Sequence, residues 1–388
     1  MITEVPLLDL KAQYASIKSE VDSQIADVLA AQHFILGPKV QEFEEKIAAM
    51  CGVKHAVGVA SCSDALLLAM MALGVGPGDS VITTAFSFFA SCGCVSRVGG
   101  RPLFCDIEAD TYNIDSAKVE ALLKGECEQT AQGVRHRPTG TRVRAIIPVH
   151  LYGQCANMTA LGEIAERFGL RLVEDAAQSI GARHRRKPSG AMGALGCLSF
   201  FPTKNLGAYG DGGMVVTNDD DLAKKVRILR VHGAQPKYFN IMVGMNSRLD
   251  ALQAAILLAK LPHLADWAVV RQEKAAYYNR GLAGVAGVTT PSVRPENECV
   301  FHQYVIRTKE RDALMAFLKE RRIGSAIYYP QALHLSGCYR GIGWAQGDFP
   351  EAESAARETL ALPIYPELTD EQQDYVIGSV REFSDRKR

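Results

Sequence analysis

Between residues 54 and 232 of this 388-residue chain, short apolar runs rich in β-formers alternate with helical stretches. The runs that we predict as strands are KHAVGVAS, SVITTAF, PLFCDI, AIIPVHLYG, LRLVEDA, CLSFF and MVVTN. Stretches such as SDALLLAMMALG, MTALGEIAERFG and DDLAKKVRILRVHG predict helices between several of them. Apolar strands separated by helices predict a mostly parallel sheet with both faces covered. In such a sheet, ligands bind beyond the carboxyl ends of the strands.

The chain length predicts two domains. We place an N-terminal segment and a large α/β domain in residues 1–250, and a smaller α+β domain in residues 251–388. The second part begins with a long helical stretch broken at Pro262, followed by strand-like VFHQYVIR, helical DALMAFLKERRIG and strand-like SAIYYP. The polar segment 125–144 predicts a surface insertion, to which we assign no role.

Composition argues against several classes of partner. Lys+Arg and Asp+Glu both total 43, so the balance gives no general attraction to nucleic acid or to an anionic membrane. No apolar run reaches the roughly 20 residues of a membrane span, and the N-terminus lacks a signal pattern. The ten cysteines form no CxxC pair. We therefore expect a cytoplasmic protein with reduced thiols, no metal site and no membrane or nucleic-acid partner.

Two residues indicate the chemistry. Lys204 lies between an apolar run and a glycine-rich turn in CLSFFPTKNLGAYGDGG, and Asp175 ends the predicted strand LRLVED. A lysine that forms an imine and a buried aspartate that faces a pyridine nitrogen are what pyridoxal phosphate chemistry requires. Taken alone, a lysine is more often a solvated loop residue, and an aspartate after a strand is as often a helix cap.

A phosphate site is predicted where SCSD, residues 61–64, joins a strand to a helix. Backbone amides at a helix start attract anions, and Ser63 and Ser199 add hydroxyls, although the same residues are also ordinary N-caps. Phe86 and Phe88 offer a ring to stack on a flat cofactor, and both face one side if the strand continues. Core packing is the alternative for either ring. Glycines 190, 193 and 196 lack the spacing of a dinucleotide fingerprint.

With these motifs in hand, the chain resembles the DegT/DnrJ/StrS-type nucleotide-sugar aminotransferases over almost its full length. The matching segments are FILGPKVQEFEEKIA, SDALLLAMMALGVGPGDSVIT, VEDAAQSIGA, SFFPTKNLGAYGDGGMVVTND, RVHG and GMNSRLDALQAAIL. The resemblance implies the aspartate-aminotransferase-like fold, called fold type I, and a homodimer with shared active sites. It also implies pyridoxal 5'-phosphate as cofactor, with pyridoxamine phosphate as the intermediate form.

By position in the resemblance, Lys204 matches the Schiff-base lysine and Asp175 the pyridinium partner. The other implied cofactor contacts are Gln178 beside the phenolic oxygen, Phe88 on the ring, and Ser63, Ser199 and the neighbouring subunit's asparagine, here Asn246, on the phosphate. Cys62 is also among the implied phosphate contacts; it stands where family members usually have glycine, and we expect its side chain to crowd the phosphate or to require a different backbone angle.

The family implies a nucleotide-linked keto-sugar as substrate and glutamate as amino donor. The segments MNSRLD and YGQCA are most similar to members that act on UDP- or dTDP-linked 3-keto sugars. Arg248 is a candidate partner for a carboxylate. His302, Tyr329 and His334 are candidates for sugar or nucleotide contacts, with domain packing as the alternative.

Two other functions stay open. A sugar dehydratase of the same fold usually replaces the Schiff-base lysine, so Lys204 argues against it. A non-catalytic regulatory protein of the same fold is the second alternative, and the presence of both Lys204 and Asp175 argues against that.

Overall fold

The computed structural model describes residues 4–386 and contains a central nine-stranded sheet. Seven strands follow the order β1-β11-β10-β7-β6-β2-β3, and the hairpin β4–β5 joins β6 at its side. The strands of the sheet are β1 (His55–Val59), β2 (Asp79–Thr84), β3 (Arg101–Cys105), β4 (Cys127–Thr130), β5 (Gly133–His136), β6 (Arg142–Ile147), β7 (Arg171–Asp175), β10 (Leu195–Ser199) and β11 (Gly213–Thr217).

Strand direction brings the loops of the predicted site to one edge. The pairs β10–β7, β6–β7, β2–β6 and β2–β3 are parallel, whereas β11 runs antiparallel to both β1 and β10. It follows that β1 and β10 point the same way as β7, β6 and β2. The carboxyl ends of these five strands meet at one edge of the sheet, where parallel sheets bind ligands. The prediction of a mostly parallel α/β fold is confirmed.

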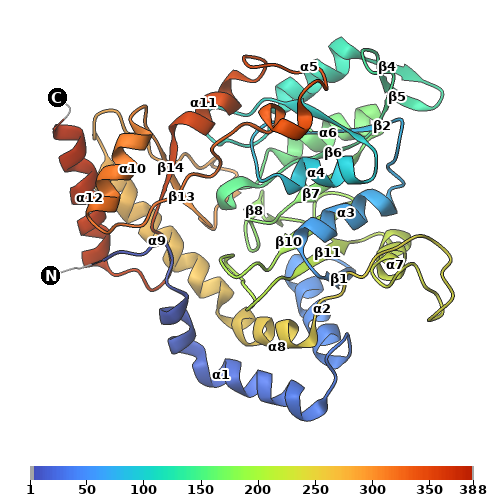
Figure 1. Cartoon of the computed structure of the whole chain (residues 1–388), viewed down its shortest axis with the longest axis horizontal. Coiled ribbons are helices and arrows are strands. Elements are labelled where there is room, and N and C mark those ends of the chain that lie inside the picture. The colour runs from blue at the N-terminus through green and yellow to red at the C-terminus, as the bar shows by residue number, and fades with distance from the viewer. Residues whose placement is uncertain (1–3, 387–388) are drawn as a thin grey trace.

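Helices cover both faces of this sheet (Figure 1). One buried cluster joins the sheet to α3 (Cys62–Ala72), α4 (Ala90–Arg97) and α7 (Asp220–Leu229). A second joins it to α2 (Pro38–Cys51) and α8 (Ala251–Lys260). Apolar strands buried on both sides explain the continuous hydrophobic runs in the sequence. The long helix α1 (Leu10–Ala31) packs along α8, and α5 (Ser116–Glu126) and α6 (Met158–Phe168) pack on the part of the sheet formed by β7, β6, β2 and β3.

The segment 125–144 differs from its prediction as a plain surface insertion. It forms the hairpin β4–β5, which extends the sheet through a pair between Arg135 and Arg142. Cys127 and Val134 are buried in the cluster beneath it. Two apolar side chains are therefore enough to attach this polar hairpin to the core.

The C-terminal part forms its own core around an antiparallel pair, β13 (Tyr304–Arg307) and β14 (Thr359–Leu362). Its helices are α9 (Leu264–Leu282), α10 (Arg311–Glu320), α11 (Pro350–Glu358) and α12 (Asp370–Asp385). The break predicted at Pro262 falls in the short 3-10 turn Leu261–His263 between α8 and α9. The strand predicted at SAIYYP was wrong, because only Ala326 makes an isolated bridge, to Ala361. The boundary near residue 250 stays a prediction.

Small elements complete the architecture. They are the strands β8 (Arg183–His184), β9 (Lys187–Pro188) and β12 (Asn297–Glu298), and the 3-10 turns Leu151–Gly153, Leu333–Leu335 and Gly337–Tyr339. Val5 pairs with Ile323 and is buried in the core of the small domain, so the start of the described chain packs on its C-terminal part.

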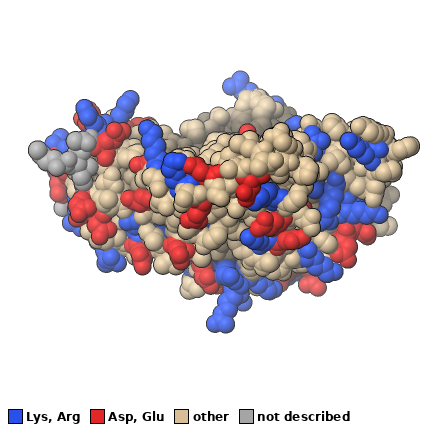
Figure 2. All heavy atoms as spheres, turned by 90° about the horizontal axis from the view of Figure 1, so that it is seen from below, with Lys and Arg blue, Asp and Glu red and all other residues tan. Residues whose placement is uncertain are grey.

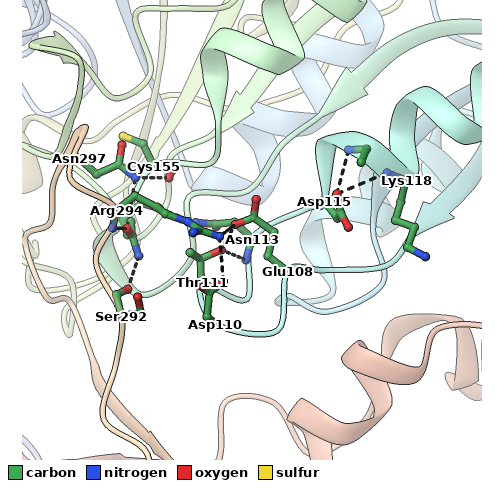
Figure 3. Close-up of polar contacts among 12 residues, drawn as sticks. Glu108, Asp110, Thr111, Asn113, Asp115, Lys118, Cys155, Ser292, Arg294 and Asn297 are labelled. Carbon is green, nitrogen blue, oxygen red and sulfur yellow. Dashed lines mark hydrogen bonds and ion pairs between the residues drawn. The ribbon is translucent and has the colours of Figure 1, made fainter.

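A polar seam ties the segment before β12 to the loop after β3 (Figure 3). Arg294 donates to the carboxylates of Glu108 and Asp110, at 3.3 and 3.0 Å. Asn113 is buried; its amide donates to the carbonyl of Gln154 at 3.1 Å and its side-chain oxygen accepts from the Leu151 N–H at 2.9 Å. The seam therefore fixes the loop that follows β6, at the same edge as the predicted site.

Basic and acidic side chains are interspersed on the face seen in Figure 2. Within residues 4–386, no helix is long and apolar enough to cross a membrane. The same residues contain no cluster of three or more His, Cys, Asp or Glu side chains suited to a metal ion. All ten cysteines are free, and only Cys338 is exposed.

Candidate active site

Lys204 lies in the tight connection between β10 and β11. Its N–H donates to the carbonyl of Phe201 at 2.9 Å, and a Cβ on Gly207 would lie 2.2 Å from the carbonyl oxygen of Pro202. The lysine side chain is half-buried, and its amine makes no hydrogen bond or ion pair with any residue that the structure describes. Burial lowers the pKa of the amine, against the opposing charges of Cys62 and Asp175. A lowered pKa favours the neutral, nucleophilic amine.

Asp175 ends β7 and is buried. Its Oδ2 accepts from the hydroxyl of Ser91 at 2.6 Å, and its Oδ1 accepts from the N–H of Ala177 at 3.2 Å. Burial raises the pKa of this carboxyl group, whereas these two donors and the charge of Lys204 lower it. The structure thus brings Lys204 and Asp175 together at the carboxyl ends of adjacent strands.

Gln178 is held in one orientation. Its Oε1 accepts from the backbone N–H of Tyr152 at 2.7 Å, and its Nε2 donates to the hydroxyl of Tyr329 at 3.0 Å. Because the backbone supplies a donor, the amide oxygen must face Tyr152. One N–H of the Gln178 amide remains for a ligand oxygen, as the predicted contact with a phenolic oxygen requires.

The predicted phosphate turn is the first turn of α3. Ser61 is its N-cap, and the Ser61 hydroxyl accepts from the N–H of Asp64 at 3.1 Å. The next amides, of Cys62 and Ser63, belong to a helix start, where backbone N–H groups have no partner within the helix. Cys62 has no positive φ, and its side chain is buried in the core, so this turn does not depend on a glycine backbone there. Ser199, at the end of β10, is also buried, and its Oγ accepts from the N–H of Phe201 at 3.4 Å.

Gly213 lets this turn pack against β11. A Cβ at Gly213 would lie 2.3 Å from the carbonyl carbon of Ser61. We expect Gly213→Ala to displace the turn, to weaken pyridoxal phosphate binding about tenfold or more, and to destabilise the fold by about 1–3 kcal/mol. Spectral titration with the cofactor and urea unfolding measure the two effects.

Gly162 in α6 provides the matched control, because a Cβ there meets nothing within 4 Å. Gly162→Ala should stabilise the helix by about 0.5–1 kcal/mol and leave cofactor affinity unchanged. Equal cofactor affinity in the two variants would contradict the assignment of this turn as the phosphate-binding site.

Phe86 and Phe88 do not share a face. β2 ends at Thr84, so the strand does not continue through them. Phe86 is fully buried in the core, whereas Phe88 is 56% exposed, with its ring centroid 6.0 Å from that of Tyr329. Phe88, the ring implied by the resemblance, is therefore the one available to a ligand.

Asn246 and Arg248 flank the phosphate turn on another side. Ser247, between them, accepts from the N–H of Ala60 at 3.2 Å. Asn246 is exposed and pairs with Val231, and Arg248 is half-buried without a hydrogen bond or ion pair among residues 4–386. Arg248 is thus available to a ligand carboxylate, and the contact of Asn246 with a neighbouring subunit stays a prediction.

His302 lies close to Lys204, whose charge lowers the pKa of the imidazole further than burial alone does. Its Nδ1 is 3.2 Å from Oδ1 of Asn205, whose amide N–H donates to the Val300 carbonyl. This arrangement fixes a neutral imidazole with its proton on Nδ1. A cavity of about 80 Å³ adjoins His302 on the small-domain side.

His334 is placed differently from the other candidates. It is buried, 3.2 Å from a carboxylate oxygen of Glu353, and its ring packs against Phe349. No contact within residues 4–386 joins it to Lys204 or Asp175, so this placement favours the packing role.

Sequence reasoning missed the network behind Asp175. The Glu174 carboxylate is fully buried; it accepts from the N–H groups of Gly190, Met192 and Gly193, and lies 2.8 Å from His150 Nε2. A Cβ on Gly193 would lie 2.7 Å from a backbone oxygen of Leu172. Glycines 190 and 193, which do not form a dinucleotide fingerprint, are thus explained by hydrogen bonds to Glu174 and by close backbone packing on β7. The only sequence signals for this network were the acidic Glu174 next to Asp175 and His150 after a predicted strand.

Lys260 was also missed. This fully buried lysine ends α8; its Nζ donates to the carbonyl of Gly207 at 2.7 Å and lies 4.3 Å from the ring centroid of Tyr209. It therefore holds the loop that contains Lys204. Burial lowers the pKa of the Lys260 amine to about 8.

The Lys260 amine makes stability depend on pH. Because its folded pKa is below the ordinary value of 10.5, the unfolded chain binds more protons between about pH 8 and 10.5, and stability rises with pH in that window. We expect wild type to gain about 1–2 kcal/mol relative to Lys260→Met between pH 7.5 and 9.5. Urea unfolding of both proteins at the two pH values measures this difference. A constant difference would show that Lys260 titrates normally.

The donor set fits pyridoxal phosphate. Lys204 offers an unpaired amine, Asp175 a buried carboxylate, Gln178 a free amide N–H, and the start of α3 unpaired backbone amides. When bound, the cofactor would supply an electron sink and a carrier for an amino group.

Comparisons with known proteins identify the family of this chain. The family model described as the DegT/DnrJ/EryC1/StrS aminotransferase family matches residues 15–381. A dTDP-3-amino-3,4,6-trideoxy-alpha-D-glucose transaminase of Streptomyces venezuelae is 44% identical, over 98% of this chain and 97% of the relative. A protein of Geobacillus stearothermophilus named pleiotropic regulatory protein is 49% identical, over 98% of each chain.

The fold is also similar to that of a solved structure. The crystal structure of DesV from S. venezuelae in complex with a ketimine intermediate superposes with a TM-score of 0.93 and 44% identity. The match covers 99% of this chain and 100% of that one.

Proposed function

The chain belongs to the DegT/DnrJ/EryC1/StrS aminotransferase family, and from this premise we propose that it transfers an amino group from glutamate to a nucleotide-linked 3-keto hexose. The observation that supports the proposal most is that the half-buried Lys204, in the loop after β10, lies close enough to the buried Asp175, at the end of the adjacent strand β7, for each charge to shift the pKa of the other group. The cofactor is pyridoxal phosphate. The cytoplasm is the proposed setting, in agreement with ten free cysteines.

Each residue of the proposed site has its own role in the reaction. Asp175 holds the proton on the pyridine nitrogen, and the first turn of α3 binds the phosphate. With the cofactor bound, the Lys204 amine would act as the base that takes the proton from the donor carbon and later returns it. Arg248 binds a carboxylate, of glutamate or of a uronate sugar.

The substrate class rests on the relatives. The similarity to the S. venezuelae transaminase supports a dTDP-linked sugar aminated at carbon 3, and a UDP-linked 3-keto sugar is the alternative. The exposed ring of Phe88 offers a stacking surface for the cofactor, and the neutral His302, near Lys204, offers a hydrogen-bonding group for the sugar.

Dimer formation is part of the proposal. The loop after α7 projects from the body at the edge of Figure 1 and exposes Tyr238, Phe239, Ile241 and Val243. Exposed apolar patches mark interaction sites, and this loop leads directly to Asn246. We expect Val243→Asp to convert a dimer into a monomer and to weaken cofactor binding, as measured by light scattering and spectral titration. A wild-type monomer that turns over would contradict the shared site.

A regulatory role without catalysis is the second candidate, and the name of the Geobacillus relative, pleiotropic regulatory protein, favours it. Incubation with ¹⁵N-glutamate, pyridoxal phosphate and dTDP- or UDP-linked 3-keto hexoses separates the two. An amino-sugar product that contains ¹⁵N, with an equal amount of 2-oxoglutarate, supports the transaminase. Absence of both products with every sugar, from protein that binds the cofactor, supports the regulatory role.

A further inference from the structure

The hydroxyl of Ser91 lies behind the proposed cofactor position. Ser91 is the second residue of α4, and both it and Asp175 are buried. The 2.6 Å contact between Ser91 Oγ and Asp175 Oδ2 is shorter than the contact of Asp175 with Ala177. Hydrogen bonds to an ionised carboxylate are the short and strong ones.

Ser91 has one proton and three oxygen neighbours. Its Oγ lies 3.1 Å from Ser87 Oγ and 3.2 Å from the carbonyl oxygen of Phe88, and both are longer than the contact with Asp175. The proton therefore goes to the carboxylate. Ser87 then donates to Ser91, so that two buried hydroxyls point in sequence at Asp175.

Other titratable groups near Asp175 interact with it only through their charges. Within residues 4–386, none of them donates a hydrogen bond to its carboxylate. These groups are Lys204, His150, Tyr329, Cys62, Cys94 and Cys197. Ser91 is thus the one side chain in the described residues that donates to this carboxylate.

We propose that Ser91 is a positioning residue for the transamination, whose hydroxyl keeps the Asp175 carboxylate ionised and in one orientation against the pyridine nitrogen. The proposal rests on the proposed function. A carboxylate that loses this donor becomes more basic and takes the shared proton from the nitrogen. The nitrogen is then a weaker electron sink, and Asp175 is free to rotate.

The test uses the full-length protein reconstituted with pyridoxal phosphate labelled with ¹⁵N in its ring. In Ser91→Ala, we expect the ring ¹⁵N signal to move toward that of unprotonated pyridine, and kcat to fall roughly tenfold to a hundredfold with little change in KM for glutamate. Ser91→Thr retains the hydroxyl and should restore the wild-type signal. Ser96→Ala removes a hydroxyl of the same helix that contacts the Tyr339 hydroxyl and not Asp175, and should leave the signal near that of wild type.

Wild-type signals in Ser91→Ala, with only a lower melting temperature, would overturn the proposal and leave a packing role. Failure of the proposed function looks different. A wild-type protein that shows no signal from bound cofactor would refute the function and the role of Ser91 together. A protonated ring without amino transfer to any sugar would refute only the substrate.

Discussion

Lys204→Ala is expected to abolish covalent attachment of the cofactor and to lower amino transfer by about 10³-fold or more. The reason is that, in the proposed function, the half-buried amine with its pKa lowered by burial is both the group that bonds the cofactor and the base that moves the proton. Borohydride reduction followed by mass spectrometry measures the attachment. In wild type, the added mass should lie on the peptide that contains Lys204.

Lys124→Ala is the control for this experiment. Its side chain is exposed and pairs with Glu120 on α5, where such a pair has little effect on stability. The control should keep both attachment and activity. Attachment that persists in Lys204→Ala would assign the chemistry to another lysine.

Asp175→Asn should have opposite effects on activity and on the stability of the cofactor-free protein. Loss of the carboxylate removes the partner of the pyridine nitrogen, so we expect kcat to fall by about 10²-fold or more. Burial is the largest influence on this carboxyl group and raises its pKa above the ordinary value. The stability associated with the protonated carboxyl is therefore present at low pH and lost as the pH rises through the folded pKa.

At neutral pH, the cofactor-free Asp175→Asn protein should consequently melt at a higher temperature than wild type, because the amide of similar shape has no charge to bury. Below the ordinary pKa of aspartate, the two proteins should melt alike. Calorimetry at two pH values, with kinetics on the loaded proteins, measures both effects. A variant that is less stable at neutral pH would show that the Ser91 and Ala177 donors outweigh burial.

The strand–helix alternation was sufficient to predict the sheet and the edge at which ligands bind. It placed Asp175 at a strand end and Lys204 in a tight turn, and the structure brings the two together. The end of β7 could be predicted because the apolar run stops at Glu174 and Asp175.

Features that depend on tertiary contacts could not be predicted from the sequence. SAIYYP has strand-forming residues, but only Ala326 finds a strand partner. Phe86 and Phe88 have the spacing of one strand face, yet β2 ends before them. The backbone N–H groups that donate to Glu174 come from a loop 16 to 19 residues further along the chain, and no local pattern predicts such a pairing.

Ser91 shows the same limit at the site itself. Ser91 is one of two serines in TTAFSFFASC and has no distinguishing local signal, and it is 84 residues from Asp175 in the chain. Only the parallel arrangement of β2, β6 and β7 makes the two neighbours. Gln178 was predicted, but the contacts that orient it, with Tyr152 and Tyr329, follow from the fold.

The visible absorbance of the purified protein with pyridoxal phosphate, recorded before and after glutamate is added, tests the central claim most directly. We predict an absorption band of the lysine-bound cofactor that bleaches when glutamate is added, with release of 2-oxoglutarate. A protein that binds the cofactor without any band, or a band that glutamate leaves unchanged, would contradict glutamate-dependent transamination at Lys204.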